Sequence, residues 1–293
     1  MADFRYDQAE GLRRLLGRGN LRVIALAAGC SGVGQTSATI NIAAALVARG
    51  RQVLVIDENS GPANVGGSLG LRPRFDLQNV VRRECSVEDA LLYERGGVAV
   101  LPVAAATREL PGLRRAERER LIRSLSHLED RFDVVLVDTR FSAAGPGLMS
   151  AAAQDTIIVS SAAMRAITAS YALIKRLRAG RREGRLHVLL NRVAVERNAG
   201  VIFGNLQRVA RHHLQTPIEC LGCVPKDDNL QRAAQEFQPV VEVYPASASA
   251  AGYRRIAEAI AGWQPTGRRR NGVDNFMQRL LASSNFAFAN AGV

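Results

Sequence analysis

The stretch that decides the fold is Leu21-Arg-Val-Ile-Ala-Leu-Ala-Ala28, which runs directly into Gly29-Cys-Ser-Gly-Val-Gly-Gln-Thr36. An apolar run of strand length therefore leads into a glycine-rich loop, and a helix-length segment, Thr36–Ala48, follows. Gly29, Gly34 and Thr36 match the phosphate-binding pattern G-x-x-x-x-G-K-[ST], whereas Gln35 stands in the place of lysine. Because backbone N–H groups and a helix start attract anions, the stretch predicts a phosphate-binding loop.

Outside this stretch, short apolar runs alternate with helix-length segments as far as residue 262. Runs of Val, Ile and Leu without alternation are typical of strands that are buried on both faces of a parallel sheet. The sequence therefore predicts an α/β fold with a doubly wound, mostly parallel sheet, whose ligand binds beyond the carboxyl ends of the strands. The predicted strands are Leu21–Ala28, Gln52–Ile56, Val98–Val103, Val134–Val137, Thr156–Ser160, His187–Leu190 and Ile218–Leu221, and the other helices are Ala116–Leu128, Ile167–Arg178, Val201–Leu214 and Ala248–Ala261.

The chain divides into one domain and two short helical appendages. Residues 1–20 form an N-terminal segment with a linker, 21–262 the α/β domain, 263–272 a second linker, and 273–293 a C-terminal helix and tail. No run reaches the ~18 apolar residues of a membrane span, and the start MADFRYDQAEG is not a secretory signal. We therefore expect a cytoplasmic protein.

The charge and the cysteines leave two questions open. The net charge of +12 fits either an anionic partner, such as nucleic acid or a membrane surface, or a generally arginine-rich composition. Cys220 and Cys223 form one CxxC pair with no second pair at zinc spacing, which favours two buried strand thiols over redox or metal chemistry.

Several further motifs, in their order and spacing over residues 21–262, resemble the MinD/ParA family of deviant P-loop ATPases. The family's K-G-G-x-G-K-[ST] loop corresponds to residues 30–36, its D-x-D-x-G-x-x-N element to 57–64 and its D-T-G-x-G element to 138–142. Residues 167–175, ITASYALIK, are similar to the family's I-T-D-A-Y-A-L-I-K helix, and 224–227 resemble its I-P-x-D loop, which contacts the base. Asn191-Arg192, at the end of a predicted strand, resembles the family's adenine-reading position.

The resemblance implies that the chain binds ATP or ADP with Mg²⁺ and names the residues that do so. Thr36 and Asp138 would hold the Mg²⁺ ion. The nucleotide would be held by the following residues: Gly29, Cys30, Ser31, Gly32, Val33, Gly34, Gln35, Thr36, Ser37, Asp57, Asn59, Asp138, Asn191, Arg192, Pro225 and Asp227.

The departures from the family pattern fall on the residues that carry charge. Cys30 replaces the signature lysine, Gln35 replaces the lysine of the β- and γ-phosphates, and Asn59 replaces an aspartate at a catalytic position. Arg140 replaces a glycine, and its side chain would either fill the γ-phosphate space or supply a substitute charge. Because cationic clamps on the phosphates contribute ~10³-fold or more in rate, we expect weak nucleotide binding and very slow or absent hydrolysis. Without the signature lysine, an ATP-driven homodimer also loses support.

The N-terminal segment resembles that of flagellar-number regulators of the FlhG/FleN type. Asp7-Gln8, followed by Leu12-Arg13, is similar to the segment by which those proteins stimulate a signal-recognition-type GTPase. Asp7 can also cap a helix whose apolar stripe fits a partner groove, and the alternative is a fraying helix without a partner. The resemblance implies a regulator of flagellar number or placement, with flagellar assembly or regulatory proteins as further partners.

The C-terminal segment is predicted to be an amphipathic helix preceded by Arg268, Arg269 and Arg270. Such a helix can lie in an anionic membrane surface, which would make the protein peripherally membrane-associated. The alternative is that the helix packs on its own domain. Its apolar face consists of Phe276, Met277, Leu280 and Leu281.

Two other functions compete with this reading. A ParA-like partitioning or MinD-like division-site protein shares the core motifs, and a ParA-like protein would bind nucleic acid in a salt-dependent way. A short-chain NAD(P)-dependent dehydrogenase is suggested by Tyr171-x-x-x-Lys175, although the glycine spacing is one residue short of its pattern. The membrane-type helix disfavours the nucleic-acid partner.

Overall fold

The computed structural model describes residues 21–126, 128, 131–139, 153–180 and 184–263. No helix of these residues is long and apolar enough to cross a membrane. Their eight-stranded sheet has the order β3-β4-β2-β5-β1-β6-β7-β8, and all pairs are parallel except β3 with β4. The strands are β1 (Arg22–Ala27), β2 (Val53–Asp57), β3 (Leu92–Tyr93), β4 (Ala99–Pro102), β5 (Val134–Asp138), β6 (Asp155–Ser161), β7 (Arg185–Val193) and β8 (Glu219–Pro225).

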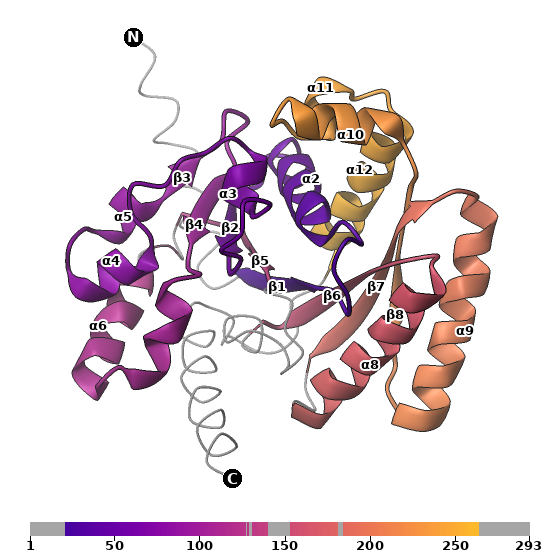
Figure 1. The fold of residues 1–293 in the computed structure, drawn as a ribbon, viewed down its shortest axis with the longest axis horizontal. Coiled ribbons are helices and arrows are strands. Elements are labelled where there is room, and N and C mark those ends of the chain that lie inside the picture. The colour runs from indigo at the N-terminus through magenta and orange to yellow at the C-terminus, as the bar shows by residue number, and fades with distance from the viewer. Residues whose placement is uncertain (1–20, 127, 129–130, 140–152, 181–183, 264–293) are drawn as a thin grey trace.

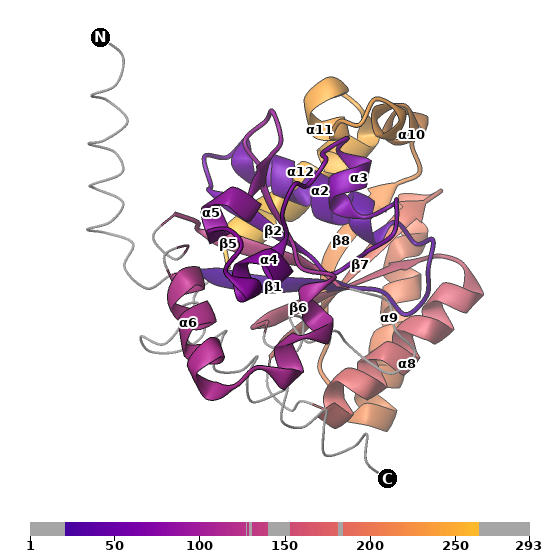
Figure 2. The same ribbon diagram turned by 60° about the vertical axis from the view of Figure 1, so that its left-hand side comes forward.

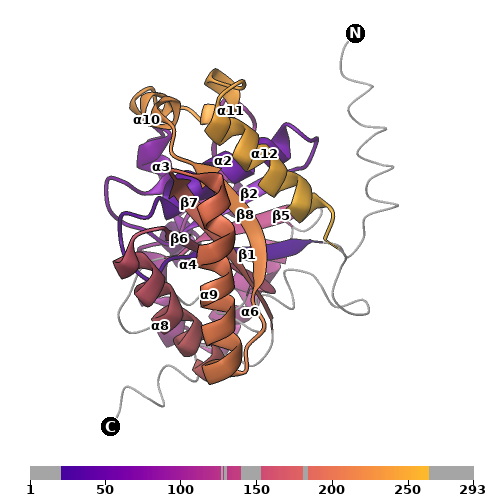
Figure 3. The same cartoon turned by 90° about the vertical axis from the view of Figure 1, so that its right-hand side faces the viewer.

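Helices cover both faces of the sheet (Figures 1 and 3). One face packs against α2 (Gln35–Val47), α3 (Val65–Ser68), α10 (Asp228–Gln235), α11 (Val240–Val243) and α12 (Ala248–Ala261). The other face packs against α4 (Leu77–Arg82), α5 (Val87–Ala90), η1 (Ala106–Arg108), η2 (Leu110–Gly112), α6 (Arg115–Ser126), α8 (Met164–Gly180) and α9 (Glu196–Leu214). Figure 2 shows α4 and α5 near α6.

The core explains why the strands carry no apolar–polar alternation. In β1, Ile24 and Leu26 face the layer of α2 and α12, while Val23 and Ala25 face the opposite layer. All four side chains are almost completely buried, because each face of the strand meets a helix layer. The predicted doubly wound α/β fold is therefore confirmed. Every strand and helix predicted within residues 21–262 overlaps an observed one, whereas the helices predicted for the two ends of the chain lie outside the described residues.

One expectation about the strands was wrong. Cys220 is exposed and Cys223 is only half-buried, although both were predicted to be buried strand thiols. The reason is that β8 is an edge strand, so its first residues have no neighbouring strand on one side. Exposure of this kind depends on strand order, which the local pattern does not reveal.

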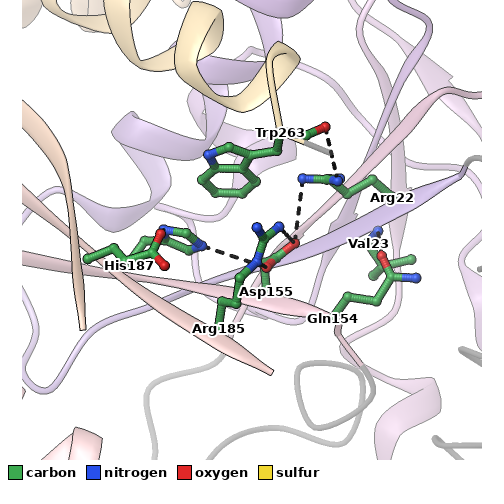
Figure 4. A network of polar contacts seen from close by, with 8 residues as sticks. Arg22, Val23, Gln154, Asp155, Arg185, His187 and Trp263 are labelled. Carbon is green, nitrogen blue, oxygen red and sulfur yellow. Dashed lines mark hydrogen bonds and ion pairs between the residues drawn. The ribbon is translucent and has the colours of Figure 1, made fainter. Parts of the chain in front are cut away.

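A charged cluster lies at the amino ends of the strands, away from the glycine loop, and connects the strand starts to the end of α12 (Figure 4). Asp155, buried at the start of β6, accepts a 2.7 Å hydrogen bond from Arg185 and lies 3.8 Å from Arg22. The ring of Trp263 stacks on His187 at 4.1 Å, and its carbonyl accepts a 3.2 Å bond from Arg22. Burial disfavours the Asp155 anion, but the contacts with His187, Arg185 and Arg22 outweigh it and lower the pKa of this carboxyl.

We expect Asp155→Asn to lower the free energy of unfolding by about 3 kcal/mol, because it leaves buried guanidinium charge without its counter-ion. Urea denaturation followed by circular dichroism measures this change. Glu258→Gln is the matched control, since it breaks an exposed 3.8 Å pair with Arg49 and should cost less than about 1 kcal/mol. Equal losses in the two variants would contradict a structural role for the buried cluster.

Candidate functional site

The glycine loop between β1 and α2 has the backbone of a phosphate-binding loop. Gly32 and Gly34 have φ of 81° and 85°, a conformation that L side chains rarely adopt. Gly34 is the N-cap of α2, and no side chain caps the helix there. The N-terminal N–H groups of α2 therefore remain suited to an anionic ligand.

Close packing also requires Gly29 and Gly34 in this loop. A Cβ atom on Gly29 would lie 2.2 Å from the carbonyl oxygen of Ala169 on α8. A Cβ atom on Gly34 would lie 2.4 Å from the side-chain nitrogen of Asn191 at the end of β7. The loop is thus held between β7 and α8 at a separation that only glycine permits.

Asp138, fully buried at the end of β5, is the centre of the polar site. Its Oδ1 accepts hydrogen bonds from Gln35 Nε2 and Thr39 Oγ1, both at 2.9 Å. Its Oδ2 accepts bonds from Thr36 Oγ1 at 2.7 Å and from Asn59 Nδ2 at 2.8 Å. We call these five residues the Asp138 cage. All four donors are neutral, so the cage supplies hydrogen bonds without positive charge.

Gln35 does more than fill the place of the family's lysine. Its amide also donates a 2.7 Å bond to the backbone carbonyl of Thr139, which fastens the phosphate loop to the end of β5. A lysine ammonium in this place would neutralise Asp138, whereas the amide cannot. The substitution therefore preserves the geometry of the loop and removes its charge.

A second buried carboxylate lies beside the cage. Asp57 ends β2 and is paired in register with Asp138 on β5. It accepts backbone bonds from Asn59 at 3.0 Å and Val65 at 2.8 Å. Burial and the neighbouring Asp138 charge raise the pKa of Asp57 to about 6, and burial also raises the pKa of Asp138.

The donor set fits Mg²⁺ better than it fits a bare phosphate. Carboxylate and hydroxyl oxygens are the ligands that Mg²⁺ prefers, and Thr36 and Asp138 offer both kinds. Their mutual hydrogen bond would have to open for the ion to enter. Within the described residues, no cluster of three or more His, Cys, Asp or Glu side chains forms a metal site made by protein alone.

The end of β7 is bonded to backbone carbonyls of the phosphate loop. Asn191 is fully buried and donates from Nδ2 to the carbonyl of Val33 at 2.9 Å. Arg192 donates from Nη1 to the carbonyl of Gly32 at 3.1 Å. We call Asn191 and Arg192 the β7 clasp, because together they hold consecutive carbonyls of the phosphate loop.

The end of β8 is built differently. Asp227, two residues after Pro225, caps α10 through the N–H of Asn229 and accepts bonds from the N–H and hydroxyl of Ser249, all at 2.9 Å. Burial opposes ionisation of Asp227, but these hydrogen bonds lower the pKa of the carboxyl. An open cavity of about 680 Å³ lies here, lined by Lys226, Asp227, Asp228, Asn229, Arg232 and Ala248. A role of Asp227 in reading a base stays a prediction.

The structure thus gathers the predicted residues of the loop with Asp57, Asn59, Asp138, Asn191 and Arg192. Thr39 was not predicted, although its place one helical turn after Gln35 on α2 could have indicated it. Several predicted residues lie outside the described part of the chain: Asp7, Gln8, Leu12, Arg13, Arg140, Phe276, Met277, Leu280 and Leu281. Tyr171 is half-buried in the apolar cluster of α8 and α9, and Lys175 on α8 is exposed.

A parallel sheet with a strand–glycine loop–helix unit at its carboxyl edge defines a phosphate-loop nucleotide-binding protein. Residues 24–240 match the CobQ/CobB/MinD/ParA nucleotide binding domain. The chain belongs to this family, and within it to the FleN type.

Its similarity to named relatives spans most of both chains. It is 32% identical to the antiactivator FleN of Pseudomonas aeruginosa over 89% of this chain and 94% of that one. It is 25% identical to the flagellum site-determining protein YlxH of Helicobacter pylori, over 90% of this chain and 91% of that one. The solved MinD cell division protein of Aquifex aeolicus shares the fold, with 22% identity, a TM-score of 0.65, and coverage of 84% of this chain and 100% of that chain.

We expect the side-chain carboxyl of Asp57 to titrate with a midpoint of about 6 in carbon-detected NMR, well above the ordinary 3.8. Because the folded pKa exceeds the unfolded one, this group adds to stability as the pH falls from about 7 towards 4. The exposed Asp89, whose pKa is lowered by hydrogen bonds from Ser86, is the internal control and should titrate below 3.8. A midpoint for Asp57 at or below that of Asp89 would contradict the buried carboxylate pair.

Proposed function

We propose that this protein regulates flagellar number or placement as a MinD-like nucleotide-binding protein whose ATP hydrolysis is weak or lost. Similarity to FleN and to YlxH over about nine-tenths of the chain supports the flagellar role. The observation that carries the loss of hydrolysis is the Gln35 amide 2.9 Å from Asp138, where the family places lysine.

The proposed cofactor is ATP or ADP with Mg²⁺. The MinD of Pyrococcus horikoshii, solved in complex with Mg-ADP, shares the fold with a TM-score of 0.63 over 83% of this chain. When bound, Mg²⁺ neutralises phosphate charge and would be held by Thr36 and Asp138. The backbone of the phosphate loop would surround the phosphates, and Pro225 with Asp227 would lie near the base.

The residues of the site explain why turnover would be slow. Phosphoryl transfer depends on positive charge placed at the transferring group. Cys30 and Gln35 supply none, and Asn59 donates its side-chain N–H to Asp138 rather than offering a carboxylate to the attacking water. The described part of the site would therefore bind and orient phosphates, but positions 30 and 35 lack the charges that stabilise the transition state.

The proposed partners contact the two ends of the chain. The segment with Asp7, Gln8, Leu12 and Arg13 would contact a signal-recognition-type flagellar GTPase. The helix with Phe276, Met277, Leu280 and Leu281 would bind the membrane surface, so that the protein is cytoplasmic and peripherally membrane-associated. Flagellar assembly proteins and a second copy of the chain are further candidates, and in the solved MinC:MinD cell division protein complex of Aquifex aeolicus a MinD relative assembles with a partner.

In the presence of Mg²⁺, the wild-type protein should release phosphate from ATP at the same rate as Thr36→Ala, within error. The reason is that the missing lysine charges contribute ~10³-fold or more in rate. A continuous phosphate-release assay on the full chain measures both. Turnover comparable with that of lysine-containing family members, and lost in Thr36→Ala, would contradict the proposal.

In cells, deletion of the gene should change the number or position of flagella, counted by electron microscopy. Wild type and Thr36→Ala should both restore the normal number, whereas Gln8→Ala and Phe276→Glu should not, because function would lie in the two ends. Arg18→Ala, in the predicted N-terminal linker, serves as the control and should restore it. A defect in division or plasmid segregation with normal flagella would instead favour the division-site or partitioning alternative.

A further inference from the structure

Arg192 has a backbone conformation that is rare for a residue with a side chain. Its φ is 57°, in the left-handed region, directly after the fully buried Asn191. The side-chain oxygen of Asn191 accepts the N–H of Arg192 at 3.0 Å and holds this conformation. Such conformations often mark functional sites, where the surrounding structure holds them in place.

The consequence is that the Arg192 side chain reaches the phosphate loop. Nη1 donates to the carbonyl of Gly32 at 3.1 Å, and Nε lies 3.9 Å from the place of a Cβ atom on Gly34. The guanidinium therefore lies along the two glycines whose positive φ shapes the loop. A guanidinium has five N–H donors, so the bond to Gly32 leaves others for an anion.

No carboxylate of the described residues neutralises the charge of Arg192, because none forms an ion pair with it. Arg22 and Arg185, in contrast, form ion pairs with Asp155 at the amino ends of the strands. Around the loop, Asp57 and Asp138 add negative charge, and Cys30 and Gln35 add no positive charge. An incoming polyphosphate therefore meets a negative site with Arg192 at its rim.

We infer that Arg192 supplies the positive charge with which the phosphate loop binds a nucleoside di- or triphosphate, in place of the lysines that positions 30 and 35 lack. The inference rests on the proposed nucleotide site. It assigns Arg192 to the phosphates of the nucleotide, whereas the family resemblance assigns this position to the adenine base. Arg192 acts from β7, at the rim of the loop, and so contributes to binding without entering the place that Gln35 occupies against Asp138.

The test is a fluorescence titration of the full-length protein with MANT-ATP and MANT-ADP in the presence of Mg²⁺. We expect Arg192→Gln to weaken binding by about tenfold or more, as for loss of a charged hydrogen bond, and Arg192→Lys to stay within about threefold of wild type. Arg208→Gln is the matched control, because Arg208 is exposed on α9 and bonds only to Asn205 among the described residues. Competition with inorganic tripolyphosphate separates phosphate recognition from base recognition and should be weakened by the same substitution.

A second measurement uses the wild-type protein and so does not depend on folding of the variants. ATP should slow phenylglyoxal modification of Arg192, read by mass spectrometry, and leave the modification of Arg208 unchanged. Arg192→Gln binding within about twofold of wild type, or an Arg192 modification rate that ATP does not change, would overturn the inference. A wild-type protein that binds no nucleotide would also overturn the inference. The flagellar role would be tested separately, by the complementation experiment with Thr36→Ala.

Discussion

The buried carboxylate of Asp138 is the constraint on which the site depends. It lies at the end of β5, a central strand, where an ionised group needs partners to offset the loss of water. The partners come from the phosphate loop, from the first turns of α2 and from the loop after β2. One side chain therefore fastens together the segments that would surround a nucleotide.

Buried carboxylates at the amino ends of the strands and at their carboxyl ends are stabilised in opposite ways. At the strand starts, Asp155 is paired with Arg185 and Arg22, and its pKa is lowered. At the strand ends, Asp138 and Asp57 accept hydrogen bonds only from neutral donors among the described residues, and their pKa values are raised. The first arrangement stabilises the fold by itself, whereas the second leaves negative charge that a bound cation can neutralise. The unbalanced end of the sheet is the one that carries the phosphate loop.

This chain separates the shape of a phosphate loop from its charge. Gly32 and Gly34 keep the backbone conformation of the loop, and the β7 clasp holds the carbonyls of Gly32 and Val33. The amide of Gln35 keeps the contact with β5 that places the loop. This FleN-type chain in this way retains the fold and the phosphate-loop backbone of its family without the two lysines of the family pattern. Under the proposed function, its role depends on what it contacts rather than on what it hydrolyses.

The sequence by itself determined the sheet, its parallel direction and the place of the glycine loop. These follow from local information, because an apolar strand without alternation is typically buried on both faces, and a left-handed turn favours glycine. The two-residue β3 and the short α3, α4, α5, α10 and α11 were missed, since so few residues show no periodicity. The order of the motifs along the chain also identified the family before any contact was known.

Only the tertiary structure decided which side chains meet. Gln35 and Asp138 are 103 positions apart, and Arg192 and Gly32 are 160 apart, so no local pattern relates them. The same holds for Asp227, which bonds to Ser249 on α12, and for Cys220, whose exposure follows from its edge strand. Residue types indicated that charge was missing from the loop. The fold determined where the remaining charge of Arg192 lies, because the left-handed backbone after Asn191 turns that side chain onto the loop.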